Sequence, residues 1–273
     1  LGTGATNGAT DATSPYTRGY SFGSGALSAS GAQTLTATDG AGNTATTSVT
    51  LTADGSGPTT PALAISSGTC GVYQSTASAT VSFSGASDGG SGLLQYRFTT
   101  DGSAPTAATG SAGSSVTITS SGVTTVSVIA VDNVGNVSAV ATCAVQLDTV
   151  APTTGTPSIS ESSGALYATG TTLYYRPSGA GGEGFTVTLT PTDAVSGVAS
   201  VDFPVIGGMG TGATNGATDA SSPYSFAYTF GSGALTAAGT ETLTVTDNAT
   251  NSATTNFTLT PDSTAPSGIA IAL

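Results

Sequence analysis

The chain has 273 residues, of which 37% are hydrophobic, so it is long enough for two or three domains that each bury a core. The 15 acidic and three basic residues give a net charge of −12, and the sequence contains no Lys and no His. Because basic side chains must neutralise phosphate groups, we expect no nucleic-acid partner. No apolar run approaches the roughly 20 residues that span a bilayer, so we expect no membrane insertion.

The composition predicts an all-β chain. Only 7% of the residues are charged, and the residues that usually fill exposed helix faces, such as Glu, Gln and Lys, are scarce or absent. Thr and Val alternate over many short stretches instead, which is typical of strands.

The first 65 residues return at the end of the chain. Residues 1–65 align without a gap with residues 209–273, at a constant offset of 208 (209 − 1), and 40 of the 65 positions are identical. The segment GTGATNGATDA begins at Gly2 and again at Gly210, and the segments SPY and FGSGAL recur in the same way. Such long identity at one offset marks an internal repeat.

Three linkers in which an Asp is followed four residues later by Pro divide the chain, because Pro ends strands and stiffens the entry to the next domain. They begin at Asp54, Asp148 and Asp262, and the intervals of 94 (148 − 54) and 114 (262 − 148) residues each suit one sandwich of about 100 residues. We call the first interval the B-type domain and the second the A-type domain. The prediction is a linear array with the second half of an A-type domain (1–54), a B-type domain (55–149), an A-type domain (150–262) and the first strand of a further B-type domain (263–273).

Five strands are predicted in the B-type domain, because apolar or alternating runs there are bounded by Gly, Ser and Asp. Along the last run, every second residue from Val137 to Leu147 shares one face, which turns Cys143 toward the core. The five runs cover residues 79–83, 93–99, 115–119, 123–131 and 137–147.

The two cysteines, Cys70 and Cys143, lie near the first and last strands of the B-type domain, and we predict a disulfide between them. Such a bond closes a loop of 73 residues (143 − 70), worth roughly 4 kcal/mol in the chain-entropy description. Two buried thiols are the alternative, and a thioester between Cys70 and Gln74 would leave Cys143 without a role. A disulfide also indicates an extracellular or cell-surface location.

The A-type domain repeats the plan with six predicted strands. In every copy a short Asp/Asn turn joins the last two strands: DGAGN from Asp39, DNVGN from Asp132 and DNATN from Asp247. The six runs cover residues 173–176, 185–189, 198–206, 224–230, 241–246 and 252–260.

These turns and linkers resemble the bacterial Ig-like repeats of large surface and adhesin-type proteins, whose last hairpin often reads T-D-x-x-G-N and whose linkers often read D-x-x-x-P. The third turn departs from this pattern at Thr250, where the family has Gly. The stretch YRFTTDGSAP, from Tyr96 to Pro105, is similar to a segment of Ig-like domains of the chitobiase C-terminal type. The resemblance implies tandem immunoglobulin-like β-sandwich domains and specifies no ligand.

Catalytic chemistry is not expected. A Ser or Cys nucleophile needs a nearby base, and the chain has neither His nor Lys. Glycoside hydrolysis needs two acids held across a cleft, whereas the acids here are mostly Asp in turns, where Asp binds its own backbone. We therefore assign no catalytic residue and expect no enzyme.

Calcium is the one cofactor that the sequence suggests. This ion prefers oxygen ligands such as carboxylates, and the linker residues Asp54, Asp148 and Asp262 lie where neighbouring domains meet. Asp88 and Asp193 add matching D-x-x-S-G turns within the B-type and A-type domains. Ordinary turn chemistry explains the same acids more simply, because the sequence has no D-x-D cluster and no EF-hand loop.

The predicted function is that of a structural repeat in a long secreted or cell-surface protein, which forms a fibre, stalk or filament through contacts with other copies of itself. Lys commonly guards exposed strand edges against pairing, and this chain has none. Two alternatives remain: an adhesin or glycan-binding module whose loops, such as residues 207–224, bind surface glycans, and an accessory region of a large secreted hydrolase. The near-identical GTGATNGATDA loops favour a repeated structural contact.

Overall fold

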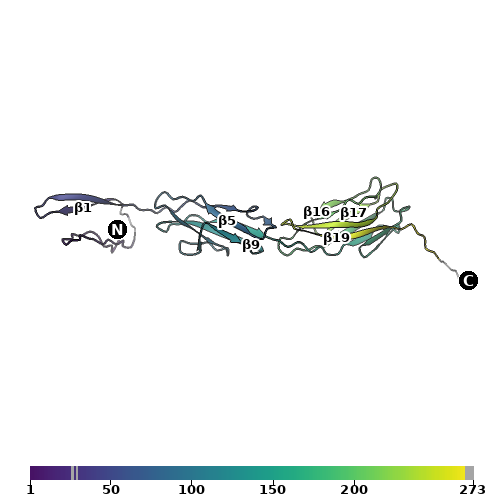
Figure 1. The fold of residues 1–273 in the computed structure, drawn as a ribbon, viewed down its shortest axis with the longest axis horizontal. Helices are drawn as coiled ribbons and strands as arrows, with labels where there is room; N and C mark the ends of the chain where they lie inside the picture. Colours follow the sequence, from purple (N-terminus) through teal and green to yellow (C-terminus); the bar gives the residue numbers. More distant parts are fainter. Residues whose placement is uncertain (26–27, 29, 268–273) are drawn as a thin grey trace.

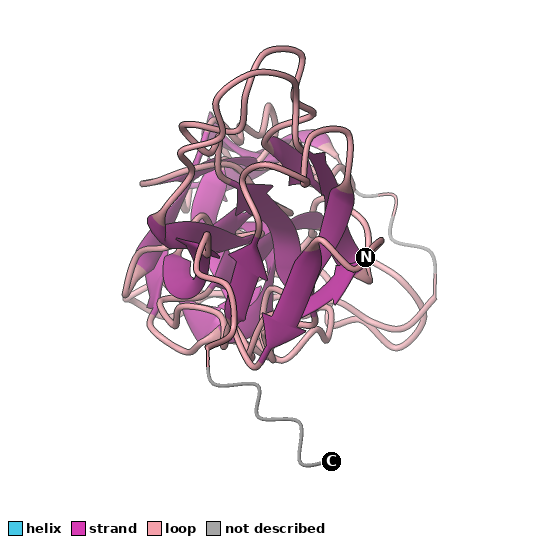
Figure 2. Cartoon of the chain, turned by 90° about the vertical axis from the view of Figure 1, so that its right-hand side faces the viewer, coloured by secondary structure: helices cyan, strands magenta, loops and turns pink. Residues whose placement is uncertain are grey.

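The computed structural model describes residues 1–25, 28 and 30–267, and every regular element among them is a β-strand. An end view of the chain accordingly shows only strands and loops (Figure 2). The prediction of an all-β chain is confirmed, since the runs rich in Thr and Val form extended strands. Within the described ranges, no helix has the length and apolar character needed to cross a membrane.

In the described part of the first 54 residues, one hairpin follows a long loop. Strands β1 (Gly31–Thr38) and β2 (Thr44–Leu51) pair antiparallel, and the hairpin lies at the N-terminal end of Figure 1. Leu35 on β1 is 45% exposed, whereas Leu243, its equivalent at the offset of 208, is fully buried. The face that forms a core in the A-type domain therefore has no packing partner among the described residues of this first region.

The B-type domain is a sandwich of two sheets. Its strands are β3 (Ala62–Ile65), β4 (Tyr73–Gln74), β5 (Ala79–Ser84), β6 (Leu93–Thr99), β7 (Ser111–Ala112), β8 (Ser115–Ile118), β9 (Gly122–Asp132) and β10 (Ala141–Leu147). One sheet has the order β4-β10-β9-β6-β7 and the other the order β3-β5-β8. Neighbouring strands are antiparallel, except that β4 runs parallel to β10.

Residues from both sheets meet in the B-type core. Val81 and Phe83 of β5 pack in one cluster with Val126 and Val128 of β9, and all four side chains are buried. Cys143 of β10 joins the same cluster. Since side chains alternate along a strand, every second residue of β5 and of β10 is buried.

The strand predicted over residues 137–147 is too long. Strand β10 begins at Ala141, and Val137 and Ala139, which the alternation placed on the core face, are exposed. Ser138 is buried instead, because its hydroxyl accepts a hydrogen bond from a backbone N–H of β9 and donates one to the carbonyl of Ala139. Val137 still forms an isolated antiparallel bridge with Val131, but the continuous strand begins only at β10.

Two sheets also build the A-type domain. Its strands are β11 (Ser158–Glu161), β12 (Leu166–Thr169), β13 (Thr172–Tyr175), β14 (Gly184–Leu189), β15 (Val198–Phe203), β16 (Ala217–Asp219), β17 (Tyr224–Thr229), β18 (Gly239–Asp247) and β19 (Ser252–Pro261). The larger sheet has the order β12-β13-β19-β18-β15-β16 and the smaller one the order β11-β14-β17. Within the described residues, no sheet contains strands from both sides of residue 148, and Figure 1 shows the two groups of strands one after the other.

Aromatic side chains fill the A-type core. Phe185 of β14 stacks on Tyr228 of β17 with ring centroids 4.9 Å apart, and its ring centroid lies 5.8 Å from that of Phe230. These three side chains are at most 2% exposed, whereas Tyr20 and Phe22, the equivalents of Tyr228 and Phe230 in the first 54 residues, are 54% and 63% exposed. In the A-type domain the repeated segment is thus buried partly by strands that precede it in the chain, such as β14.

The three Asp/Asn turns adopt one conformation. In each copy the backbone N–H of the Asp donates to the carbonyl of the Asn, and the Asp carboxylate accepts two backbone N–H groups and the Asn side-chain amide. The fourth residue has a positive φ, which is 90° at Gly42, 94° at Gly135 and 72° at Thr250. A β-branched residue is strained in this left-handed region.

Replacing Thr250 with Gly is expected to stabilise the A-type domain by roughly 1 kcal/mol, because Gly adopts a positive φ without a steric penalty. The matched change Gly135→Ala is expected to destabilise the B-type domain by about as much. A Cβ at Gly135 would meet no atom within 4 Å, so only the backbone conformation is tested there. Urea unfolding of the two single variants measures both effects, and a loss of stability in Thr250→Gly would contradict the argument from strain.

The predicted first strand of a further B-type domain, residues 263–273, lies largely outside the described residues. Residues 263–267 are described and form no strand. The start of this segment is anchored on β13, because Asp262 N donates to Tyr175 O at 2.8 Å.

Candidate metal centre

Three carboxylates converge at one end of the B-type domain. Asp54 lies in the linker before β3, Asp88 in the loop between β5 and β6, and Asp132 at the end of β9. One carboxylate oxygen from each residue lies within 4.8 Å of those of the other two. Asp132 is fully buried and the other two residues are half-buried. We call these three residues the B cluster.

The A-type domain contains an equivalent trio, the A cluster, formed by Asp148, Asp193 and Asp247 within the same limit of 4.8 Å. Asp148 and Asp247 are buried and Asp193 is half-buried. Each cluster combines a linker Asp, the Asp of a D-x-x-S-G turn and the Asp of an Asp/Asn turn. The two domains therefore build the same arrangement from three separate segments of the chain.

Turn hydrogen bonds position the carboxylates. Asp88 Oδ2 accepts the N–H groups of Gly90 and Gly92 at 3.0 and 2.7 Å, and Asp193 Oδ1 accepts three N–H groups of its own turn. The turn chemistry expected for these acids is thus present. None of the hydrogen bonds among the described residues reaches Asp88 Oδ1 or Asp193 Oδ2, which leaves one oxygen of each residue able to bind a cation.

Each linker carboxylate binds the turn of the domain that follows it. Asp54 Oδ2 accepts Ser91 N at 2.6 Å, and Asp148 Oδ2 accepts Ser196 N at 3.1 Å. The backbone N–H of Asp148 also donates to Gln74 O at 3.0 Å, on β4 of the preceding domain. Asp148 is therefore held from both the B-type and the A-type side.

Hydrogen bonds keep these carboxyl groups charged. The backbone N–H groups of Ser91 and Ser56, which donate to Asp54, hold the pKa of this carboxyl below its usual value. Burial would raise the pKa of Asp148, but hydrogen bonds from Val150 and Ser196 outweigh it, so this pKa is also lowered. At neutral pH the linker carboxylate of each cluster is consequently charged.

The buried carboxyl of the B cluster behaves in the same way. Burial would raise the pKa of Asp132, and hydrogen bonds from Asn136 and Val134 lower it by more than burial raises it. The amide of Asn136 also donates to the carbonyls of Asp54 and Ser56, both at 3.3 Å. The turn therefore holds the linker as well as its own carboxylate.

The protein's own positive charges lie elsewhere. The guanidinium of Arg18 donates to Asn7 O, that of Arg97 donates to Gly110 O, and Arg176 lines a hollow at the far end of the A-type domain. The chain has no Lys. Three adjacent carboxylates that no basic side chain neutralises favour a bound cation.

Calcium fits these donors. Two oxygen ligands of one Ca²⁺ lie at most about 5 Å apart, because each Ca–O distance is about 2.3–2.6 Å, and both clusters satisfy this limit. Ser91 Oγ is buried without a hydrogen-bond partner among the described residues, and its residue already binds Asp54, so it adds an oxygen beside the B cluster. Neither cluster contains the His or Cys ligands that softer metals prefer.

Four of the five residues predicted as metal ligands lie in the two clusters. The fifth, Asp262, belongs to neither cluster within the described part of the chain. The sequence pattern predicts Asp132 and Asp247 only as turn residues. The signal that points to them as ligands is the recurrence of all three Asp motifs, in the same order, in both complete domains.

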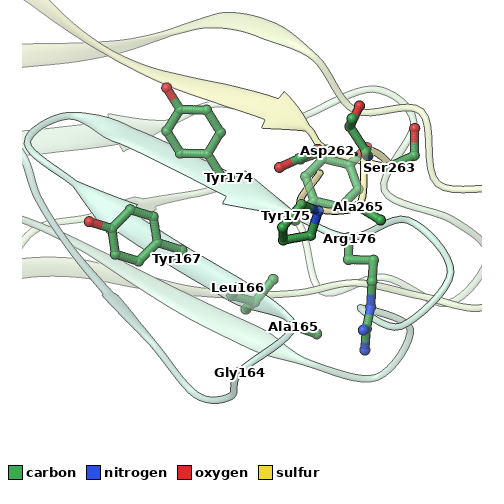
Figure 3. A pocket seen from close by; sticks show the side chains of 12 residues that line it. Gly164, Ala165, Leu166, Tyr167, Tyr174, Tyr175, Arg176, Asp262, Ser263 and Ala265 are labelled. Atoms are coloured by element: carbon green, nitrogen blue, oxygen red, sulfur yellow. Dashed lines mark hydrogen bonds between the residues drawn. The ribbon is translucent and has the colours of Figure 1, made fainter. Parts of the chain in front are cut away.

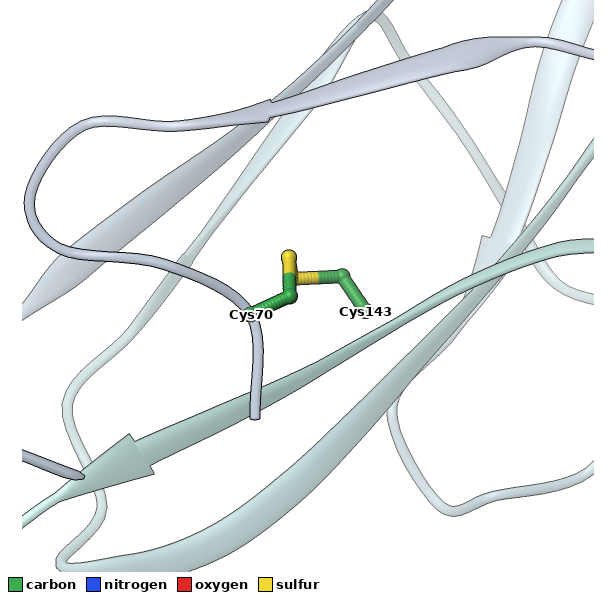
Figure 4. Close-up of a disulfide and its surroundings, with 2 residues drawn as sticks. All are labelled: Cys70 and Cys143. Atoms are coloured by element: carbon green, nitrogen blue, oxygen red, sulfur yellow. A yellow bond between two sulfur atoms is a disulfide. The ribbon is translucent and has the colours of Figure 1, made fainter. Parts of the chain in front are cut away.

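A disulfide joins Cys70, in the loop before β4, to Cys143 on β10 (Figure 4). The Cα atoms of the two residues are 5.2 Å apart. This bond excludes both alternatives, free thiols and a thioester with Gln74. The Gln74 side chain instead accepts a hydrogen bond from Ser67 Oγ at 2.7 Å.

The loop of residues 207–224, considered for glycan binding, is tied to its own domain. Thr211 forms an isolated bridge with Ser232, and Met209 is only 1% exposed. The loop thus contributes to the packing of the A-type domain.

Comparison with known proteins concerns the fold. The sequence matches no family model, and no curated protein matches it significantly. Among solved structures, the chain is similar to the fibronectin(III)-like modules of Clostridium thermocellum CbhA, with 15% identity over 72% of this chain and 93% of that chain and a TM-score of 0.36. It is also similar to the D00-D0 domain of intimin (16% identity, 73% and 100% covered, TM-score 0.32) and to a tetra-tandem repeat in the extending region of a large adhesion protein (16%, 84% and 57%, 0.26).

Proposed function

We propose that this chain is a structural repeat region of a long secreted or cell-surface protein, in which domains held in line give reach and stiffness to a fibre, stalk or filament. The observation that carries this proposal is the repeated junction. The linkers at Asp54 and Asp148 make the same carboxylate contact with the next domain, and Asp148 is also bound to the domain before it. Such two-sided bonding opposes free rotation between domains. The disulfide supports an extracellular location, because such bonds persist in oxidising compartments.

Calcium completes the proposed junction. An ion held by the A cluster would bind the linker residue Asp148 together with Asp193 and Asp247 of the A-type domain. It would neutralise the mutual repulsion of the three carboxylates and fix the linker to the domain that follows. The same reasoning applies to the B cluster.

Contacts between copies of the chain are the second part of the proposal. In the B-type domain, β3 and β8 are the edges of the three-stranded sheet, and the exposed residues Ala62 and Ala64 leave the β3 edge without charge. Unpaired backbone groups on an uncharged edge are a ready partner for another strand. The net charge of −12 opposes indiscriminate clumping, which favours ordered contacts.

The variant Ala64→Lys is expected to weaken self-association at least about tenfold, because a charged side chain on the edge opposes pairing. The matched control is Ser82→Lys, since Ser82 is exposed on the central strand β5 directly opposite Ala64. Sedimentation and electron microscopy of the full chain measure association. A parent chain that stays monomeric at all concentrations would contradict the proposed homotypic assembly. Glycan binding by such a monomer would support the adhesin alternative.

A further inference from the structure

A tyrosine hydroxyl closes the junction between the B-type and A-type domains. Tyr73, on the short strand β4, donates its hydroxyl proton to Val195 O at 2.9 Å. Val195 lies in the D-x-x-S-G turn of the following domain, two residues after Asp193 of the A cluster. This bond joins the end of the B-type sandwich to the turn that contributes Asp193 to the A cluster.

Tyr174 occupies the equivalent place in the A-type domain. Strand β13 runs parallel to the last strand of its domain, as β4 does. Tyr73 pairs with the residue two positions before Asp148, and Tyr174 pairs with the residue two positions before Asp262. In both domains the carbonyl of the residue after the tyrosine accepts the N–H of the linker Asp, at 3.0 and 2.8 Å.

The surroundings of Tyr174 are open. Its side chain is 38% exposed, and its ring centroid lies 6.4 Å from that of Tyr167, which is 62% exposed. Both tyrosines line a hollow of about 360 Å³ that also includes Arg176 and the linker from Asp262 to Pro266. In Figure 3 the two rings stand on neighbouring strands, and both hydroxyl groups point away from Arg176. None of the hydrogen bonds among the described residues uses the Tyr174 hydroxyl, whereas Tyr73 uses its own.

The sequence of the linker after Asp262 indicates which domain would occupy this hollow. Asp262 and Pro266 repeat Asp54 and Pro58 at the offset of 208. Asp262 Oδ1 accepts the N–H of the residue two positions later at 2.9 Å, and Asp54 Oδ1 accepts the equivalent N–H at 3.1 Å. The linker after Asp262 thus begins with the same hydrogen bond as the linkers that lead into the two complete domains, and its sequence is the one that precedes a B-type domain.

We propose that Tyr174 docks the B-type domain that follows Asp262, by donating its hydroxyl proton to the carbonyl equivalent to Gly90 O. In the D-x-x-S-G turns, Gly90 stands two residues after Asp88, as Val195 stands two residues after Asp193. This inference rests on the proposed function, because the tandem array supplies the B-type domain after Asp262. With this contact, the junction after an A-type domain has the same tyrosine hydrogen bond as the junction after a B-type domain.

The test lengthens the full chain by residues 66–148 placed after Leu273, because residues 263–273 stand in for residues 55–65 of a B-type domain. A photoreactive benzophenone amino acid is placed at position 174. The positive control has it at position 73, which contacts Val195, and the negative control has it at Tyr16, an exposed tyrosine that does not line the hollow. Mass spectrometry then identifies the attached residues. Position 174 is expected to attach to the added D-x-x-S-G turn of the same chain.

A second readout is amide exchange in that added turn. Tyr174→Phe is expected to speed exchange about fivefold, the weight of one hydrogen bond, while Tyr16→Phe leaves it unchanged. Attachment to other parts of the chain, or equal exchange in the two variants, would overturn the proposal. Glycan binding that requires Tyr174 and persists in the lengthened chain would overturn it as well. Self-association is measured separately by sedimentation. If the chains do not assemble with one another, the crosslinking and exchange results still report on docking within one chain.

Discussion

Replacing Cys70 and Cys143 together with Ala is expected to lower the free energy of unfolding of the B-type domain by about 4 kcal/mol. The bond closes a loop of 73 residues, and its loss restores the conformational freedom of that loop in the unfolded chain. Single domains are stabilised by only about 5–15 kcal/mol in total. The loss is therefore a large fraction of the stability, and urea unfolding under non-reducing conditions measures it.

The A-type domain is an internal control for this change, because both cysteines of the chain lie in the B-type domain. Amide exchange in increasing urea, resolved by peptide mass, follows the two domains separately in one sample. The A-type peptides are expected to keep their unfolding midpoint. A loss below about 1 kcal/mol in the B-type domain would show that the unfolded chain gains little freedom without the bond.

Several strands of both domains could be predicted because apolar or alternating runs bounded by Gly, Ser and Asp mark them in the sequence. The run over residues 93–99 coincides with β6, and the run over residues 185–189 differs from β14 by one residue. The two- and three-residue strands β4, β7 and β16 could not be predicted. Backbone pairing alone defines these short strands. Two or three residues are too few to show an alternating pattern in the sequence.

The candidate metal centre was predictable in part for a different reason. Linker and turn positions of Asp54, Asp88, Asp148 and Asp193 are visible along the sequence, but the convergence of three segments at one end of a sandwich is a property of the fold. Asp247 illustrates the difficulty, because its carboxylate satisfies its own turn and also belongs to a cluster. One carboxylate geometry is compatible with both turn hydrogen bonding and cation binding, so the sequence pattern does not separate the two.

Calcium is expected to raise the free energy of unfolding of each complete domain by about 4 kcal/mol when the free ion exceeds its Kd about 1,000-fold. The physical reason is that only the folded chain brings the three carboxylates of a cluster together. A chelator is expected to remove this gain and to shorten the mean end-to-end length seen by small-angle scattering, because the linker carboxylates lose their shared ion. Native mass spectrometry is expected to show two ions per chain, one for each cluster.

Asp247→Asn and Asp39→Asn form the matched pair for this prediction. Both carboxylates accept the same three hydrogen bonds in their Asp/Asn turns, but among the described residues only Asp247 belongs to a cluster. Asp247→Asn is expected to abolish most of the calcium-dependent stability of the A-type domain and to leave that of the B-type domain intact. Asp39→Asn is expected to leave both intact. Equal responses of the two variants would assign these acids to turn chemistry alone, and a chelator without effect on stability or length would remove calcium from the junctions.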